Sequence, residues 1–135
     1  TGGGVDVLRA GVDMIEVERI VEAILRYGDR FFDRFFTEQE LIDANGRATA
    51  LAARFAAKEA VAKALGTGIG EVGWLEIEIL TGPRREPMLQ LHGDALRVAR
   101  ELGLTRWAIS LSDTHEHAVA VAVALGGDLD GEDQD

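Results

Sequence analysis

The sequence predicts a single compact α+β domain in which a long alanine-rich helix packs on an antiparallel-rich sheet. A chain of 135 residues is long enough for one domain with a real core, but not for two. Most of its strand-like segments come as consecutive pairs joined by short turns. The resulting order of strand, helices, hairpin, helix and hairpin is typical of a compact α+β domain.

The first two elements carry the first candidate site residues. Residues 8–14, LRAGVDM, form an apolar run that ends in one acid, so we expect a buried strand with Asp13 near its C-terminal end. From Glu16 to about Tyr27, apolar residues recur at helical spacing. Three arginines fall within about 40° of one another on this helix, provided that it continues past Gly28. They form a basic stripe that faces either water or an anionic partner: Arg19, Arg26 and Arg30.

Two further helices are expected before the first hairpin. In TEQEL, residues 37–41, a threonine is followed three residues later by a glutamate, which is the capping-box spacing for a short helix through Ala44. An Asn-Gly pair ends that helix. The alanine-rich helix then runs from about Ala48 to Leu65, and Gly66 is its natural C-terminal stop.

Two hairpins and one helix complete the chain. Residues 74–80, WLEIEIL, alternate strictly, with the apolar side chains at 75, 77 and 79 on one side, and MLQLH at 88–92 is the partner strand. Asp94 is expected to cap a helix over 95–102. The strands RWAISLS and HAVAVAVAL, joined by 113–116, form the second hairpin. In the last strand valines share one face and alanines the other, which predicts that both faces are covered.

Composition disfavours several classes of protein. The longest apolar run has eight residues, against the roughly 20 of a membrane helix, and no signal-peptide pattern is present. There is no cysteine, which removes disulfides and thiolate metal sites and leaves the cytoplasm as the expected location. The net charge of -10 argues against a nucleic-acid binder.

The distribution of charge also suggests the limits of the domain. Residues 126–135 hold five acidic residues and predict a disordered, solvated tail. The glycine-rich residues 1–6 are interpreted as an appended or flexible segment outside the fold, which leaves 7–125 as the domain. Without the tail the net charge is -5, so any anionic ligand must be bound by a local basic patch.

Four charged residues stand on one half of the alanine-rich helix, opposite a half that has no polar atom: Arg54, Lys58, Glu59 and Lys63. One interpretation is a solvated face with a single weak Glu59–Lys63 pair. The other is a phosphorylated ligand with a divalent ion, because cations neutralise phosphate oxygens and a carboxylate holds the metal. Mg²⁺ takes one or two protein carboxylates, and Asp13 is the second candidate.

Two motifs together carry a family resemblance. GVDMIEVERI at 11–20, with RFAAKEAVAKALGTGIG at 54–70, resembles the holo-acyl-carrier-protein synthases, the small-type 4'-phosphopantetheinyl transferases. The resemblance extends over residues 8–125. It implies an enzyme that moves the phosphopantetheine arm of coenzyme A onto a serine of an acidic apo-acyl carrier protein and releases 3',5'-ADP. It also implies a homotrimer with sites at the subunit interfaces, and a part in fatty acid biosynthesis.

The resemblance implies a role for each matching residue. Asp13 and Glu59 are expected to bind Mg²⁺, which bridges the pyrophosphate of coenzyme A, and Lys63 to contact the phosphate under attack. Glu59 is also expected to accept the serine proton, directly or through water, with no covalent enzyme intermediate. Arg19, extended by helical geometry to Arg26 and Arg30, is expected to contact the carrier. The residues expected to bind the nucleotide and its phosphates are Arg54, Lys58, Lys63, Gly66, Pro87, Ser112 and Thr114.

The late serine-rich strand departs from the family's pattern. Asp113 stands after Ser112, where the family usually has a histidine. Because an ionised carboxylate facing a phosphate is unfavourable, Asp113 turns away, caps the turn or binds through a shared cation, and His115 is the alternative substitute. Two other functions therefore stay open: a non-catalytic coenzyme A or nucleotide-binding module of the same fold, and a plain oligomeric interaction domain. The glycines at 68, 70 and 73 match G-x-G-x-x-G but follow a helix, which disfavours a dinucleotide site.

Overall fold

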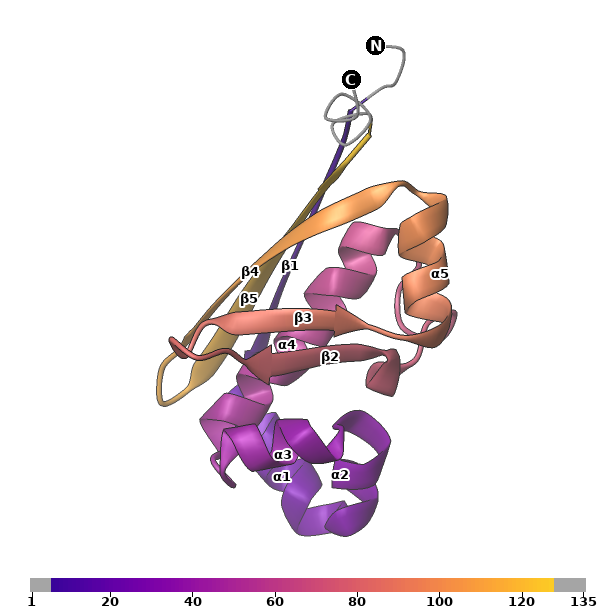
Figure 1. Cartoon of the computed structure of the whole chain (residues 1–135). Helices are drawn as coiled ribbons and strands as arrows, with labels where there is room; N and C mark the ends of the chain where they lie inside the picture. The colour runs from indigo at the N-terminus through magenta and orange to yellow at the C-terminus, as the bar shows by residue number, and fades with distance from the viewer. Residues whose placement is uncertain (1–5, 128–135) are drawn as a thin grey trace.

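The computed structural model describes residues 6–127, so most of the predicted N-terminal segment and most of the acidic tail lie outside the described residues. Figure 1 shows how the elements are arranged in space. In chain order they are β1 (Val7–Glu16), α1 (Val17–Tyr27), α2 (Asp29–Phe35), α3 (Glu38–Ala44), α4 (Ala48–Leu65), the 3₁₀ turn η1 (Trp74–Glu76), β2 (Ile77–Thr81), β3 (Pro87–Leu91), α5 (Gly93–Glu101), β4 (Leu104–Asp113) and β5 (His117–Gly126).

A three-stranded antiparallel sheet and a separate hairpin enclose the long helix. The sheet has the order β1-β5-β4, and among the described strands β2 pairs only with β3. Helix α4 lies between the sheet and the β2–β3 hairpin, while α1, α2 and α3 gather at one end of the molecule (Figure 1). The predicted α+β class, with an alanine-rich helix packed on an antiparallel sheet, is confirmed. No described helix is both long enough and apolar enough to cross a bilayer.

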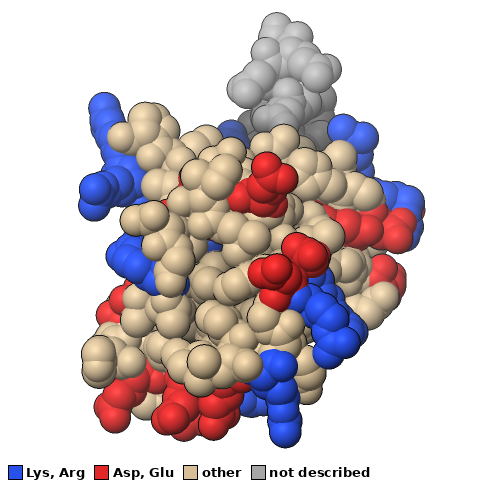
Figure 2. Space-filling model, turned by 90° about the horizontal axis from the view of Figure 1, so that it is seen from below, with Lys and Arg blue, Asp and Glu red and all other residues tan. Residues whose placement is uncertain are grey.

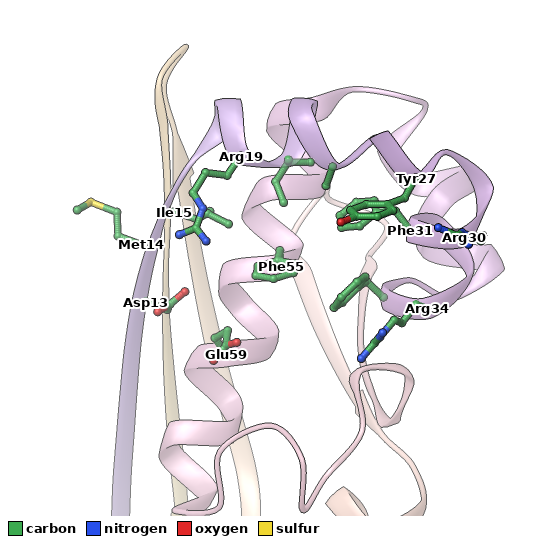
Figure 3. A pocket seen from close by; sticks show the side chains of 13 residues that line it. Asp13, Met14, Ile15, Arg19, Tyr27, Arg30, Phe31, Arg34, Phe55 and Glu59 are labelled. Atoms are coloured by element: carbon green, nitrogen blue, oxygen red, sulfur yellow. The ribbon is translucent and has the colours of Figure 1, made fainter. Parts of the chain in front are cut away.

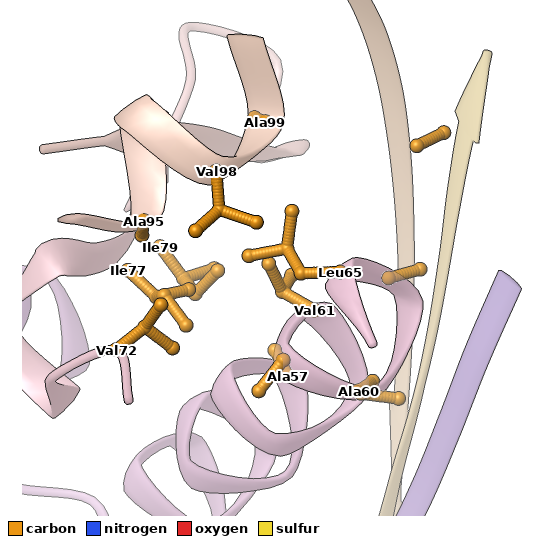
Figure 4. Packing of buried hydrophobic residues seen from close by; sticks show 14 of the residues in the cluster. Ala57, Ala60, Val61, Leu65, Val72, Ile77, Ile79, Ala95, Val98 and Ala99 are labelled. Carbon is orange, nitrogen blue, oxygen red and sulfur yellow. The ribbon is translucent and has the colours of Figure 1, made fainter. Parts of the chain in front are cut away.

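Small side chains bring α4 close to the sheet. The four alanines of β5 that face the helix, Ala118, Ala120, Ala122 and Ala124, are at most 1% exposed. A Cβ added at Gly11 of β1 would lie 1.9 Å from the carbonyl oxygen of Ala60, so only glycine allows this approach of strand and helix. On its other side α4 packs against the hairpin and α5, as the cluster in Figure 4 shows.

The opposite face of the sheet is open. The sequence predicts a buried first strand and a last strand covered on both faces, but β1 is an edge strand and the valine face of β5 has no second layer among the described elements. The large apolar residues most exposed there are Leu8 (70%), Met14 (65%), Val12 (54%) and Val121 (38%). A continuous apolar surface of this kind is typical of a protein interface.

The predicted helices agree with the structure where short-range signals decide them. The capping box is confirmed: Thr37 N donates to Glu40 Oε1, and Glu40 N donates to Thr37 Oγ1. The alanine-rich helix begins and ends at the predicted residues, and Gly66 is its left-handed C-cap at φ 80°. The predicted cap at Asp94 is wrong, because Asp94 pairs with Arg97 while the helix start is bonded by a glutamate of η1.

The first helix ends at Tyr27, as the sequence predicts. The arginine stripe requires a helix that continues past Gly28, and this condition is not met, because the φ of 56° and ψ of -129° at Gly28 turn the chain into α2. Arg26 and Arg30 therefore stand on different helices, and the continuous basic stripe does not form. Residues 74–76 form a 3₁₀ turn rather than strand, so Leu75 is 44% exposed whereas Ile77 and Ile79 are fully buried.

Candidate active site

Two acids that are far apart in the sequence meet between β1 and α4. Asp13 lies on the helix-facing side of β1, and Glu59 lies on α4 one turn before Lys63. The Lys63 ammonium donates to Asp13 Oδ1 at 3.2 Å and to the Val12 carbonyl at 2.9 Å. Figure 3 shows the Asp13 and Glu59 side chains turned toward the same gap. The structure thus brings together the three residues that the sequence places at the centre of the site.

The electrostatics of Glu59 reflect this arrangement. Partial burial raises the pKa of Glu59, the negative charge of Asp13 raises it further, and the Lys63 ammonium partly offsets both effects. Two carboxylates close enough to repel each other attract a cation that neutralises both. They supply the one or two protein ligands that Mg²⁺ takes, with phosphate oxygens and waters to fill its octahedron. The donor set therefore fits Mg²⁺ with a diphosphate, whereas the described residues contain no group of three metal-binding side chains that would hold an ion unaided.

A pocket of about 1020 Å³ begins at the two acids and runs toward α1 and α2 (Figure 3). Phe35 and Phe55 are among the aromatic residues that line it, and both pack against Trp74 outside the pocket. The Phe55 and Trp74 rings stack with centroids 4.6 Å apart, and Phe35 meets Trp74 edge-on at 4.8 Å. The lining residues fall into acids, apolar side chains and arginines: Asp13, Glu59; Met14, Ile15, Ile20, Ala23, Tyr27, Phe31, Phe35, Phe55; Arg19, Arg30, Arg34.

The arginines of this pocket differ from the predicted set. Arg19 and Arg30 line it, but Arg26 does not, and its guanidinium lies 6.0 Å from the centroid of the Tyr27 ring. Arg34 was not predicted. Its position depends on the turn at Gly28, which sets the direction of α2, and helical spacing within one segment carries no signal for it.

Lys58 has a structural role inside the protein. Its side chain is fully buried, and its ammonium donates to Glu40 Oε1 and to the carbonyls of Trp74 and Ile77, each at 2.8 Å. Glu40 is also fully buried and accepts from the backbone N–H groups of Thr37 and Ile79. The expectation that Lys58 contacts a phosphate is therefore wrong, because all three ammonium hydrogens already have partners inside the protein.

Arg54 lies near Lys58, away from the acids. Its Nε donates to the Ile79 carbonyl at 3.1 Å and its Nη2 to Thr81 Oγ1 at 2.7 Å. The four charges of α4 thus form two pairs with different surroundings, and no single charged face exists. The wheel places all four within one half-turn, yet Arg54 and Lys58 are near one edge of that half and Glu59 and Lys63 near the other.

Arg54 lines a second pocket, of about 860 Å³, together with Pro87 and Asp113. Arg47 and Arg85 add two further cations there. The other nucleotide-end residues are elsewhere in the chain. Ser112 is exposed on β4 opposite Val119, and Thr114 Oγ1 accepts from the backbone N–H groups of Glu116 and His117 and so closes the β4–β5 turn. Within one chain the predicted site residues therefore fall into two groups that do not meet.

The family model of the 4'-phosphopantetheinyl transferase superfamily matches residues 9–122, which is most of the chain. The chain belongs to this superfamily. Among its curated relatives, the holo-[acyl-carrier-protein] synthase of Herpetosiphon aurantiacus is 44% identical over 126 residues, covering 88% of this chain and 99% of the relative. That of Desulforudis audaxviator is 46% identical over 123 residues, covering 89% and 94%.

Solved structures agree with the sequence relatives. The Helicobacter pylori holo-[acyl-carrier-protein] synthase, solved in complex with coenzyme A, has a TM-score of 0.79 at 29% identity and covers 85% of this chain and 98% of its own. The Plasmodium yoelii acyl carrier protein synthase with ADP bound has a TM-score of 0.80 at 27% identity and covers 93% and 98%. The resemblance drawn from the two motifs is confirmed at the level of the family and the fold.

The raised pKa of Glu59 predicts a pH-dependent stability difference in metal-free protein. The folded state binds the Glu59 proton more tightly than the unfolded state, so this carboxyl lowers stability as pH rises from its ordinary value of 4.5 through the raised pKa. Glu59→Gln removes the effect. We expect the melting temperature of Glu59→Gln relative to wild type to increase as pH rises across that window, measured by calorimetry in chelator. A difference that is flat with pH would contradict the raised pKa that burial and the Asp13 charge together give Glu59.

Proposed function

We propose that this protein transfers the 4'-phosphopantetheine group of coenzyme A to a serine of an apo-acyl carrier protein, giving holo-carrier and 3',5'-ADP, in a Mg²⁺-dependent reaction. The observation that carries the proposal is the meeting of Asp13, Glu59 and Lys63 at one end of the pocket in a chain of this superfamily. We also propose that it acts in the cytoplasm and in fatty acid biosynthesis.

The chemistry needs no nucleophile from the enzyme. The serine hydroxyl oxygen attacks the phosphorus that carries the pantetheine arm, a new P–O bond forms, and the bond from that phosphorus to the oxygen of 3',5'-ADP breaks. Glu59 accepts the hydroxyl proton, directly or through water. Lys63 offsets the negative charge that builds on the phosphoryl oxygens.

Asp13 and Glu59 would hold Mg²⁺, which would supply further positive charge to neutralise the pyrophosphate. Lys63 also pairs with Asp13 when no ligand is bound. The two groups lie 3.2 Å apart, so the strand carboxylate already has a cationic neighbour, and 54% of the lysine side chain stays exposed to an arriving anion. The three residues together therefore bind and neutralise a diphosphate.

The second pocket is proposed to hold the nucleotide end of coenzyme A. Arg54 and Pro87 line it, and Ser112 and Thr114 follow on the adjacent strand and turn. Gly66, at the end of α4, stays in the proposed set because it lies one turn beyond Lys63. Because the two groups of residues do not meet in one chain, we propose that a homotrimer joins the first pocket of one subunit to the second pocket of its neighbour.

The open sheet face predicts how the oligomer is disrupted. If Leu8, Val12, Met14 and Val121 are buried between subunits, a charge at Val12 faces an apolar surface and destabilises the assembly. Val12→Asp is expected to reduce the solution mass from three chains to one in light scattering, and to abolish transfer with it. Glu71→Asp, an exposed loop change of similar size, is the control. A wild-type protein that is monomeric at assay concentration would contradict the trimer.

The carrier is proposed to bind beside the first pocket. Acyl carrier proteins are acidic by the resemblance, and a domain of negative net charge needs local cations to meet one. Figure 2, which views the end of the molecule formed by the helices, shows basic and acidic side chains interspersed rather than one basic field. Arg19, together with Arg30 and Arg34, lies on the pocket wall that leads to the acids. Arg26 is exposed in the last turn of α1, at the opposite end of that helix from Arg19, and is retained as an outer contact.

Reversing these charges is expected to weaken carrier binding. Arg19→Glu or Arg34→Glu should raise the KM for carrier about tenfold, with KM for coenzyme A unchanged, because local positive potential raises the encounter rate. The effect should shrink as salt is added. Arg100→Glu on α5 is the matched control and is expected to leave both constants unchanged. Equal losses for Arg100→Glu would show that only net charge matters.

The test of the activity is direct. Apo-carrier, coenzyme A and Mg²⁺ are incubated with the protein, and intact mass spectrometry detects the added arm. Modification that requires Mg²⁺ supports the transferase. The alternative, a non-catalytic coenzyme A-binding module, is favoured by Asp113 in the second pocket and predicts tight binding of coenzyme A without transfer. If the protein bound no coenzyme A, the remaining function would be a plain oligomeric interaction domain.

A further inference from the structure

We propose that Arg9 is a positioning residue that holds Lys63 and the end of α4 in register with Asp13; this inference rests on the proposed function. Arg9 lies on β1 four residues before Asp13, so both side chains point to the helix-facing side of the strand. Its Nε donates to the Ala64 carbonyl at 2.9 Å and its Nη2 to the Leu65 carbonyl at 3.3 Å. Strand β1, which carries Asp13, is thus also hydrogen-bonded through Arg9 to the last turn of α4, which carries Lys63.

The end of α4 needs this partner. The last four carbonyls of a helix have no intrahelical N–H, and here the Gly66 and Thr67 N–H groups donate to the carbonyls of Ala62 and Lys63. Those of Ala64 and Leu65 are left, and they are the two that Arg9 binds. A guanidinium at a helix C-terminus also faces the negative end of the helix dipole. Arg9 therefore keeps the last turn of α4 from fraying.

The Arg9 guanidinium lies directly against the backbone of Gly66. A Cβ at Gly66 would lie 2.6 Å from Arg9 Nη2, so the space that a side chain would take is filled by Arg9. Two residues along β1, the absence of a Cβ at Gly11 lets the strand touch the Ala60 carbonyl. Gly11 and Arg9 fix the strand to α4 at consecutive turns, and Lys63 lies on the helix between these two contacts.

Lys63 depends on this support because little else holds it. Its side chain is 54% exposed, and its two hydrogen bonds within the described chain both go to β1, at Val12 and Asp13. When the last turn loosens, the lysine moves away from the acid and from the phosphate that it is proposed to neutralise. A residue that only stabilised the fold would affect every activity equally, whereas a positioning residue acts through Lys63 alone.

A double-mutant cycle on kcat/KM for coenzyme A separates the two roles. Arg9→Met removes the donors and keeps the aliphatic stem, and it is made alone and together with Lys63→Met. We expect Arg9→Met to lower kcat/KM about 3- to 30-fold in the wild-type background, the range of a coupling of this kind. In the Lys63→Met background the further loss should be less than about twofold. Arg9→Lys, which keeps a cation at the carbonyls, should recover most of the activity.

The controls keep stability and function apart. Ile77→Val, a buried change outside both pockets, is included as a variant whose reduced melting temperature should leave kcat/KM unchanged. Hydrogen exchange of the Gly66 and Thr67 amides provides a readout that does not require transfer, and it should be faster in Arg9→Met. Equal losses in both backgrounds, no loss, or unchanged exchange would overturn the proposal. If wild-type protein transfers nothing, the proposed function fails while the exchange result still decides the role of Arg9 at the helix end.

Discussion

Asp13→Asn and Glu59→Gln should each lower kcat for carrier modification by about a hundred- to a thousandfold, the loss typical when one group that stabilises transition-state charge is removed. Each change keeps the size of the side chain and removes one negative ligand of the divalent cation. The fold should survive both changes, because the two acids repel each other and neither is fully buried. Intact-mass kinetics at saturating coenzyme A measure the effect.

A control variant and a Mg²⁺ titration test whether the loss of kcat is specific to the two acids. Glu71→Gln makes the same chemical change on an exposed loop residue and should leave kcat unchanged. Raising the Mg²⁺ concentration should recover part of the activity of Asp13→Asn, because a weakened site is filled by mass action. If Asp13→Asn were as active as wild type while Glu59→Gln was inactive, Glu59 would act as a base without a shared cation, and the proposed metal site would be incorrect.

Lys58→Met should cost about 3–5 kcal/mol of unfolding free energy, the usual loss when one partner of a buried ion pair is removed. The substitution leaves the Glu40 carboxylate buried without its countercharge, and it leaves the Trp74 and Ile77 carbonyls without the ammonium that they share. Urea unfolding followed by tryptophan fluorescence measures the change, because the Trp74 carbonyl accepts a hydrogen bond from Lys58.

A matched substitution on the same helix provides the comparison. Lys63→Met removes a half-exposed lysine, and its cost should stay within about 1 kcal/mol because exposed pairs contribute little. Glu40→Gln should also be strongly destabilising, because the neutral amide cannot balance the Lys58 ammonium. If instead Lys58→Met unfolded like wild type and lost coenzyme A binding, the ammonium would contact phosphate, as the helical pattern of charges alone predicts.

The parts of the fold set by local signals could be predicted from the sequence. The bounds of α4, the capping box of α3 and the pairing of both hairpins depend on residues within a few positions of one another. The direction of the chain after Gly28 and the 3₁₀ turn at Leu75 could not, because the first depends on tertiary contacts of α2 and strand periodicity continues through the second. There the packing of α2 and η1 on the aromatic cluster overrides the local pattern.

The candidate site was predicted unevenly, for a similar reason. Asp13 and Glu59 could be predicted as site residues because they stand in two motifs that together resemble one family. Both residues line the first pocket. Lys58 was misplaced because its partner Glu40 lies on α3, and a helix wheel contains no information about a second helix. Arg9 and Arg34 were missed because their roles depend on tertiary contacts with the end of α4 and on the direction of α2.

The most direct test of the metal site is anomalous scattering from crystals grown with coenzyme A and Mn²⁺ in place of Mg²⁺. We predict one strong peak per pocket within coordinating distance of Asp13 and Glu59, with the pyrophosphate as its other ligand and Lys63 beside it. The Asp13→Asn crystal, grown in the same way, should show the peak weakened or absent. A peak bound to only one of the two acids, or a pyrophosphate located away from α4, would contradict a divalent ion shared by the two carboxylates.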